Sequence, residues 1–124
     1  MSYYDFKKGN ADPHVFYRRE IDNNAKITGI YIDENDGSEQ EQSTWSATDF
    51  LEIEGNAIFF TGTFLQYSSN IYNAFYDADK NYISRYTLPT NPDNGVTIPA
   101  NAKYVRFSCR TNLYQSNHYF FGYS

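Results

Sequence analysis

Length, composition and charge exclude several classes of protein. The chain has 124 residues, enough for one domain, and carries 13 tyrosines, 10 phenylalanines and one tryptophan. So many aromatic rings exclude a disordered chain, and the scarcity of leucine favours strands over amphipathic helices. Ten basic against fifteen acidic residues give a net charge of −5, so nucleic acid binding is not expected. The sequence contains no stretch of 18 apolar residues, so membrane insertion is not expected either.

The first 25 residues differ from the remainder. They contain Lys7, Lys8, Arg18 and Arg19, and Asp12-Pro13 is a plausible helix start. We expect residues 1–25 to be an irregular or short-helical lead-in, which either packs on the domain or links it to a neighbour. Residues 26–124 are expected to form the domain itself.

A run of acidic residues accounts for the net charge. Five carboxylates lie within nine residues that contain no Lys or Arg: Asp33, Glu34, Asp36, Glu39 and Glu41. A solvated loop is the simpler interpretation, and cation binding is the alternative. The glycine of this run does not stand where a calcium loop of the EF-hand type requires it.

Short strands separated by turns are predicted from Lys26 onward. Residues 26–32 place Ile30 and Ile32 on one face and Tyr31 on the other. Further strands are expected within residues 46–54 and 57–67, the latter apolar on both faces and therefore central. A helix over residues 39–51, starting from a capping box at Ser38, is the alternative for one segment.

The second half of the chain continues this pattern. Residues 71–76 and 82–86 flank an Asp/Asn-rich loop and predict a β-hairpin. Residues 104–110 alternate, with Val105, Phe107 and Cys109 on one face, and residues 118–123 are aromatic enough for a last strand. The sequence therefore predicts an all-β fold, an antiparallel β-sandwich of jelly-roll type.

Three stretches together resemble a known kind of domain. They are SATDFLEIEGN (46–56), NAFYDADKNYIS (73–84) and VTIPANAKYVRFSC (96–109). In this order they resemble the jelly-roll, carbohydrate-binding-module-like domains of phage tail fibre, baseplate and receptor-binding proteins, over about residues 27–112. The resemblance implies a fold and glycan recognition, but it carries over no binding residue, because sugar contacts vary between such domains.

Catalysis and metal binding receive little support from the sequence. The two histidines, His14 and His118, lie near the ends, and Cys109 is expected to be a buried, inert thiol, so a nucleophilic triad is not expected. No His/Cys cluster has zinc spacing. Asp77, Asp79 and Asn81 are explained as a hairpin tip, with a structural calcium ion as the weaker alternative. The chain is expected not to be an enzyme.

Sugar binding requires an aromatic ring for the C–H face of a pyranose and planar polar groups for its hydroxyls. The 24 aromatic residues exceed what one small sandwich can bury, so some rings are expected at the surface. Trp45 is the first candidate, because it lies in a polar stretch. The other candidate glycan contacts are Tyr72, Tyr76, Tyr82, Tyr86, Arg85, Arg106 and Arg110.

These features predict a non-catalytic glycan-recognition module of a phage tail or receptor-binding protein. Its partners would be a host cell-surface polysaccharide and neighbouring virion proteins, within a homo-trimer that raises avidity. It would be assembled in the host cytoplasm and reside in the virion, with an extracellular location as the alternative. Two other functions stay open: a structural virion or fibre assembly module, and an accessory module of a polysaccharide-degrading enzyme.

Overall fold

The computed structural model of the chain describes residues 18–20, 26–62, 71–85, 95–114 and 117–123. Within these residues the structure is almost entirely β, and every strand pair is antiparallel. One short helix, α1 (Thr111–Tyr114), follows β9. No helix in the described ranges is long and apolar enough to cross a membrane. The predicted all-β antiparallel fold is confirmed, while its jelly-roll connectivity stays a prediction.

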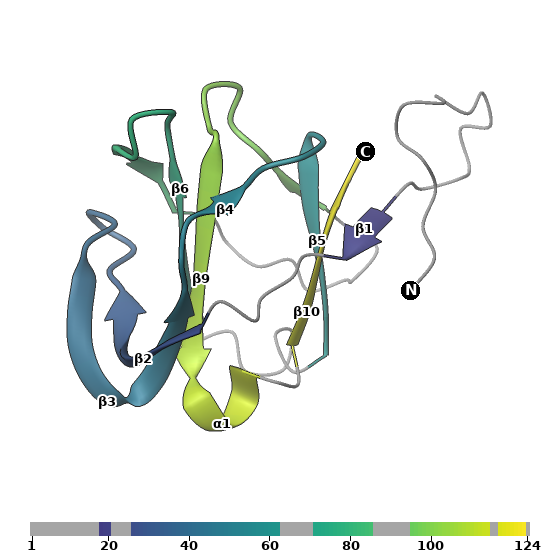
Figure 1. Ribbon diagram of the computed structural model, residues 1–124. Helices are drawn as coiled ribbons and strands as arrows, with labels where there is room; N and C mark the ends of the chain where they lie inside the picture. Colours follow the sequence, from purple (N-terminus) through teal and green to yellow (C-terminus); the bar gives the residue numbers. More distant parts are fainter. Residues whose placement is uncertain (1–17, 21–25, 63–70, 86–94, 115–116, 124) are drawn as a thin grey trace.

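The strands form two sheets, which Figure 1 shows side by side. The four-stranded sheet has the order β1-β10-β5-β8, formed by Arg18–Glu20, Asn117–Gly122, Ala57–Gly62 and Val96–Thr97. The six-stranded sheet has the order β2-β3-β9-β6-β7, formed by Lys26–Ile32, Glu39–Thr48, Tyr104–Arg110, Ile71–Tyr76 and Tyr82–Ser84. β4 (Leu51–Glu52) pairs with β9 outside this path.

The main core lies between the two sheets. Val105, Phe107 and Cys109 of β9 contact a cluster that includes Ile58 of β5 and Phe121 of β10. These β9 side chains are fully buried, as the alternation along residues 104–110 predicts. Burial of Cys109 is likewise confirmed. The inner face of the six-stranded sheet is therefore the one that the sequence pattern indicates.

Most strands lie where the sequence places them. β2 matches residues 26–32, and β6 with β7 forms the predicted hairpin, whose strands pair at Tyr76↔Tyr82. β5 lies between β10 and β8, and both Ile58 and Phe59 are fully buried, as expected of a central strand.

Two segments differ from the prediction. β3 begins at Glu39, well before the strand expected over residues 46–54, and it ends at Thr48 with the short β4 following; no helix forms there. The polar start of β3 is a strand because its backbone pairs with β2, not because of an apolar pattern. β1 lies inside the predicted irregular lead-in, and its three residues pair with the last strand, β10.

Candidate functional site

The β2–β3 hairpin covers part of the outer face of the six-stranded sheet. The second half of β3 pairs with β9, from Trp45↔Arg110 to Ala47↔Ser108, while its first half pairs only with β2. The backbone N–H of Ile32 donates a hydrogen bond to Oγ of Ser108, 3.1 Å away, so the end of β2 lies over β9. A second buried cluster, Ile32, Ala47, Ala74 and Tyr76, forms beneath the hairpin.

Arg106 is buried in this outer layer, which corrects its predicted place among the accessible glycan contacts. Its side chain is 2% exposed, and its Nε and Nη2 donate to the carbonyl of Thr48 at 3.0 and 2.9 Å. Nη2 also lies 2.8 Å from the carboxylate of Glu39. The guanidinium stacks over the ring of Phe50, 4.7 Å from its centroid. Arg106 therefore joins β9 to β3 and has a structural role.

Trp45 is also buried, so its role differs from the predicted exposed platform. It is 8% exposed, and its ring stacks on Tyr72 with centroids 5.0 Å apart and planes 16° apart. Tyr31 of β2 contacts both rings, at 5.6 Å from Trp45 and 5.5 Å from Tyr72. Trp45 thus supports two half-buried tyrosine rings, and those tyrosines, rather than Trp45, face the outside.

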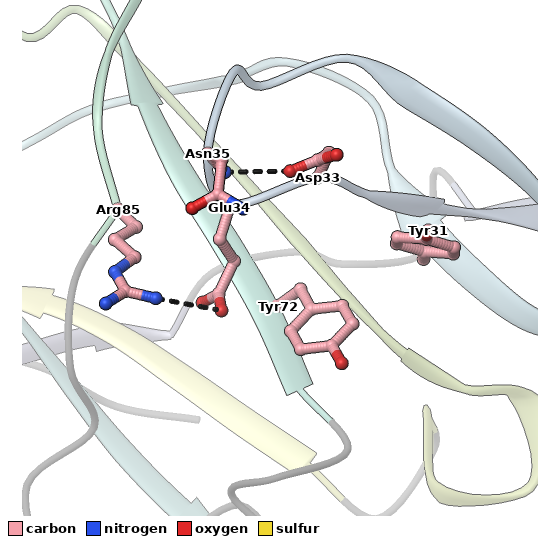
Figure 2. Close-up of a pocket in the computed structure, with 6 residues that line it drawn as sticks. All are labelled: Tyr31, Asp33, Glu34, Asn35, Tyr72 and Arg85. Carbon is pink, nitrogen blue, oxygen red and sulfur yellow. Dashed lines mark hydrogen bonds and ion pairs between the residues drawn. The ribbon is translucent and has the colours of Figure 1, made fainter.

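A cavity of about 350 Å³ opens beside these two tyrosines. The lining residues come from the end of β2, from the loop of residues 33–38 that follows it (the acidic loop), from β6 and from the segment after β7. They are Tyr31, Asp33, Glu34, Asn35, Tyr72 and Arg85. Figure 2 shows Arg85 at one end of the group and Tyr31 at the other, with Glu34, Tyr72 and Asp33 between them. We take this cavity as the candidate functional site.

The acidic loop has a defined backbone conformation. The N–H of Gly37 donates to the carbonyl of Asp33 at 2.7 Å, and the N–H of Asp33 donates to the carbonyl of Ser38 at 2.9 Å. Oδ1 of Asp33 accepts the N–H of Asn35 at 2.8 Å. Hydrogen bonds from the Ser38 hydroxyl and N–H lower the pKa of Asp36. The loop is therefore an ordered turn that places Asp33 and Glu34 at the cavity, while Asp36, Glu39 and Glu41 are exposed, as a solvated run would be.

Two tyrosine hydroxyls attach this loop to the six-stranded sheet. Tyr76 donates to the carbonyl of Gly37 at 2.7 Å, and Tyr82 donates to the carbonyl of Glu34. Burial raises the pKa of Tyr76 to about 12, so it stays protonated and keeps its donor. Gly37 has a φ of 74°, and a Cβ there would lie 2.7 Å from Cδ1 of Tyr82. The loop therefore packs closely on both rings.

These contacts give two predicted glycan residues a different role. Tyr76 is 2% exposed and Tyr82 is half-buried, and neither lines the cavity. They act on the cavity indirectly, because their hydroxyl groups hold the loop that carries Glu34.

The carboxylate of Glu34 contacts both β6 and Arg85. Its Oε2 accepts the backbone N–H of Asn73 on β6 at 3.4 Å, and its Oε1 lies 4.0 Å from Nη1 of Arg85. Burial raises the pKa of Glu34, and the hydrogen bond from Asn73 and the charge of Arg85 oppose that shift. Arg85 itself is 61% exposed and can turn its remaining donors toward a ligand.

The other predicted residues lie outside the cavity. Arg110 is exposed at the end of β9, across from Trp45. The carboxylate of Asp77 accepts the backbone N–H groups of Asp79 and Asn81, both at 2.9 Å, which is the pattern of a hairpin tip. In the ranges that the structure describes, no three His, Cys, Asp or Glu residues are grouped to hold a metal ion. Tyr86 and His14 lie outside the described residues.

Of the glycan contacts predicted from the sequence, Tyr72 and Arg85 line the cavity; Tyr31 and Asn35 are not among the candidates, and Asp33 and Glu34 are candidates only for cation binding. One signal was present: Tyr31 stands on the face of its strand opposite Ile30 and Ile32, two residues before the acidic run begins at Asp33.

The cavity combines two kinds of surface. Rings of Tyr31 and Tyr72 offer flat apolar area, and the carboxylates, the amide of Asn35 and the guanidinium of Arg85 offer planar hydrogen-bonding groups. Such a lining suits a small polyhydroxylated ligand. Comparison of the chain with models of protein families, with curated proteins and with solved structures finds no match.

Proposed function

We propose that this chain is a non-catalytic carbohydrate-recognition module that binds a sugar in the cavity between Tyr31, Tyr72 and the acidic loop. The observation that carries the proposal is the Tyr72 ring, which lines the cavity within reach of Glu34 and Arg85 while Trp45 supports it from behind. A pyranose stacks its C–H face on such a ring and directs its hydroxyls to planar polar groups at the rim.

The rigidity of the platform supports this proposal. Tyr72 is fixed by stacking on Trp45 and by contact with Tyr31, so little side-chain freedom is lost when a ligand binds. The backbone of the acidic loop is fixed by Tyr76 and Tyr82. A site whose groups are already in place keeps more of its contact energy as affinity.

The size of the cavity also supports a small ligand. About 350 Å³ is near the lower end of the range of about 300–1,000 Å³ that is usual for small-molecule sites. We expect one or two sugar rings to be held, with weak affinity for a single site. Repetition of the chain in a larger assembly would raise the avidity without new contacts. A place in a phage tail or receptor-binding protein, with a host-surface glycan as ligand, rests on the resemblance of the three stretches named above.

A glycan array followed by titration tests the proposal. We expect Tyr72→Ala to lower the affinity for the bound glycan by about tenfold or more, because it removes the stacking ring. Tyr123→Ala is the matched control, since Tyr123 is 44% exposed and does not line the cavity. Binding equal in the two variants would place the site elsewhere.

The competing assembly function has its own readout. Light scattering of the purified chain, without glycan, measures its oligomeric state. An obligate oligomer that binds no glycan on the array would replace the proposed function with a structural one.

A further inference from the structure

The charges that line the cavity are not balanced. Asp33 and Glu34 contribute two carboxylates, Arg85 contributes one guanidinium, and Asn35 is neutral. The guanidinium lies toward Glu34, with Nη1 4.0 Å from Oε1. Among the lining residues that the structure describes, no second basic residue is present to balance Asp33, and together they carry one excess negative charge.

Asp33 is held in place by its own turn. Its Oδ1 accepts the N–H of Asn35, and its backbone N–H donates to the carbonyl of Ser38. Figure 2 shows it on the Tyr31 side of the cavity, away from Arg85. The cavity therefore has two different ends: a paired one at Glu34 and Arg85, and an anionic one at Asp33 and Tyr31.

Aromatic rings add to the negative potential at the anionic end. The faces of Tyr31 and Tyr72 attract a cation that lies within about 6 Å of a ring centroid. The neighbouring residues add further negative charge, because residues 33–41 contain five carboxylates and no Lys or Arg. One of these, Glu39, is neutralised by Arg106, and the remaining four keep this part of the chain acidic.

We propose that the cavity selects a sugar that carries a positively charged amino group, over its N-acetylated and its carboxylated counterparts. The inference rests on the proposed glycan-binding function and names the ligand class of that same site. The ammonium group lies at Asp33 and against the ring of Tyr31, while the ring hydroxyls meet Glu34 and Arg85. A carboxylated sugar would bring like charges together at Asp33, and an N-acetyl group would leave that carboxylate without a cationic partner.

Three probes of equal length test this selectivity: trimers of glucosamine, of N-acetylglucosamine and of galacturonic acid. Isothermal titration at about pH 6 keeps most of the sugar amines protonated, because the pKa of such a primary amine lies above that pH. We expect the glucosamine trimer to bind about tenfold or more tighter than either of the other two. Equal or tighter binding of the N-acetylated or carboxylated trimer would overturn the selectivity and leave the glycan-binding function standing.

The outcome in which none of the three trimers binds, and the glycan array is also blank, would overturn both proposals together. A bound array glycan that carries no amine, combined with no binding of the glucosamine trimer, overturns the selectivity alone.

A charge-matched pair of variants separates the site from general attraction of a cation to an acidic protein. Asp33→Asn keeps an oxygen that can accept the N–H of Asn35 and removes the charge, and we expect it to lower the affinity for the glucosamine trimer about tenfold. Glu52→Gln removes the same charge from an exposed position on β4 that does not line the cavity, and little change is expected. Equal effects of the two substitutions would contradict the assignment.

Folding of the variants is checked by thermal unfolding. Asp33→Ser is the second variant if Asp33→Asn proves unfolded, because a serine oxygen can still accept the N–H of Asn35 in such a turn and carries no charge. It too is expected to lower the affinity for the glucosamine trimer more than Glu52→Gln does, and an equal effect would again contradict the assignment.

Discussion

The two faces of the six-stranded sheet are buried in different ways. The inner face packs Phe75, Val105 and Phe107 against apolar side chains of the other sheet. The outer face buries a small apolar cluster together with the charged Arg106 and the polar Ser108, beneath a hairpin of the same chain. Hydrogen bonds hold the outer layer together, whereas apolar contacts hold the inner one.

Because of this difference, the inner face mainly determines the stability of the fold, and the outer layer mainly determines the geometry of the cavity. Apolar packing is not directional, so the inner core can be held by any side chains of suitable volume. Hydrogen bonds to Thr48, Gly37 and Glu34 are directional, and they fix where the β2–β3 hairpin and its acidic loop lie on the sheet. The cavity is at the margin of the outer layer, so its geometry depends on those bonds. Substitutions on the two faces should therefore have different consequences.

The largest loss of stability is expected on the inner face. Phe107 is fully buried, and Phe107→Ala should lower the free energy of unfolding by about 3–5 kcal/mol, because it removes apolar contacts and leaves a hole. Urea unfolding followed by tryptophan fluorescence measures the change. A loss below about 1 kcal/mol would mean that the inter-sheet contact is not the main core.

A smaller loss is expected in the outer layer. Arg106→Met removes both hydrogen bonds to Thr48 and the ion pair with Glu39, and should cost about 3 kcal/mol. The carboxylate of Glu39 is half exposed and can be hydrated, which limits the cost. Glu39→Gln is the comparison variant, expected to cost about 1 kcal/mol because the bonds to Thr48 remain. If Arg106→Met is neutral in urea unfolding, the guanidinium does not stabilise the layer.

A pair of glycine variants isolates the packing of the loop on the sheet. Gly37→Ala places a Cβ against Tyr82 and Tyr76 at a φ of 74°, and should cost about 2 kcal/mol with a loss of glycan affinity. Gly29 has a φ of 89°, and a Cβ at that position would have no atom within 4 Å, so Gly29→Ala should cost about 1 kcal/mol from backbone strain alone. Equal thermal shifts in the two variants would show that the loop does not press on the tyrosines.

The smallest effect is a pH dependence from Glu34. The groups that face it are Asp33, Tyr82, Arg85 and the backbone N–H of Asn73. Burial raises its pKa above the ordinary value of 4.5, so in the window between the two values the folded chain holds more protons than the unfolded chain. The contribution of Glu34 to the free energy of unfolding should therefore fall as the pH rises through that window, and then stay level.

Urea unfolding of wild type and Glu34→Gln over the acidic pH range measures this contribution as the difference between the two profiles. Parallel profiles would mean that Glu34 titrates alike in both states.

The inner face of the six-stranded sheet could be predicted from the sequence, because apolar and polar residues alternate along β9. Val105, Phe107 and Cys109 alternate with polar residues, so the face that they share follows from the period of a strand. Alternation does not report whether the opposite face is covered. Arg106 is polar and outward in the pattern, yet it is buried, because a hairpin distant in sequence lies over it.

The same limit applies to the candidate site. Tyr72 and Arg85 could be selected by residue type alone, but their partnership with Asp33 and Glu34 depends on how the β2–β3 hairpin folds onto the sheet. The expectation of exposed rings is met in part: Tyr123 is exposed, Tyr31 and Tyr72 are half-buried, and Trp45 is buried. Aromatic rings that stack on one another bury part of their surface, and the number of aromatic residues in a sequence does not predict this burial.

The pairing of β2 with β3 is irregular at one point. Thr28 pairs with Ser46 and Ile30 pairs with Glu41, so a step of two residues on β2 corresponds to five on β3. The surplus lies at Gln42, Ser43 and Thr44, which are exposed. This bulge bends β3 between the half that pairs with β9 and the half that pairs only with β2, and so directs the hairpin over the outer face of the sheet.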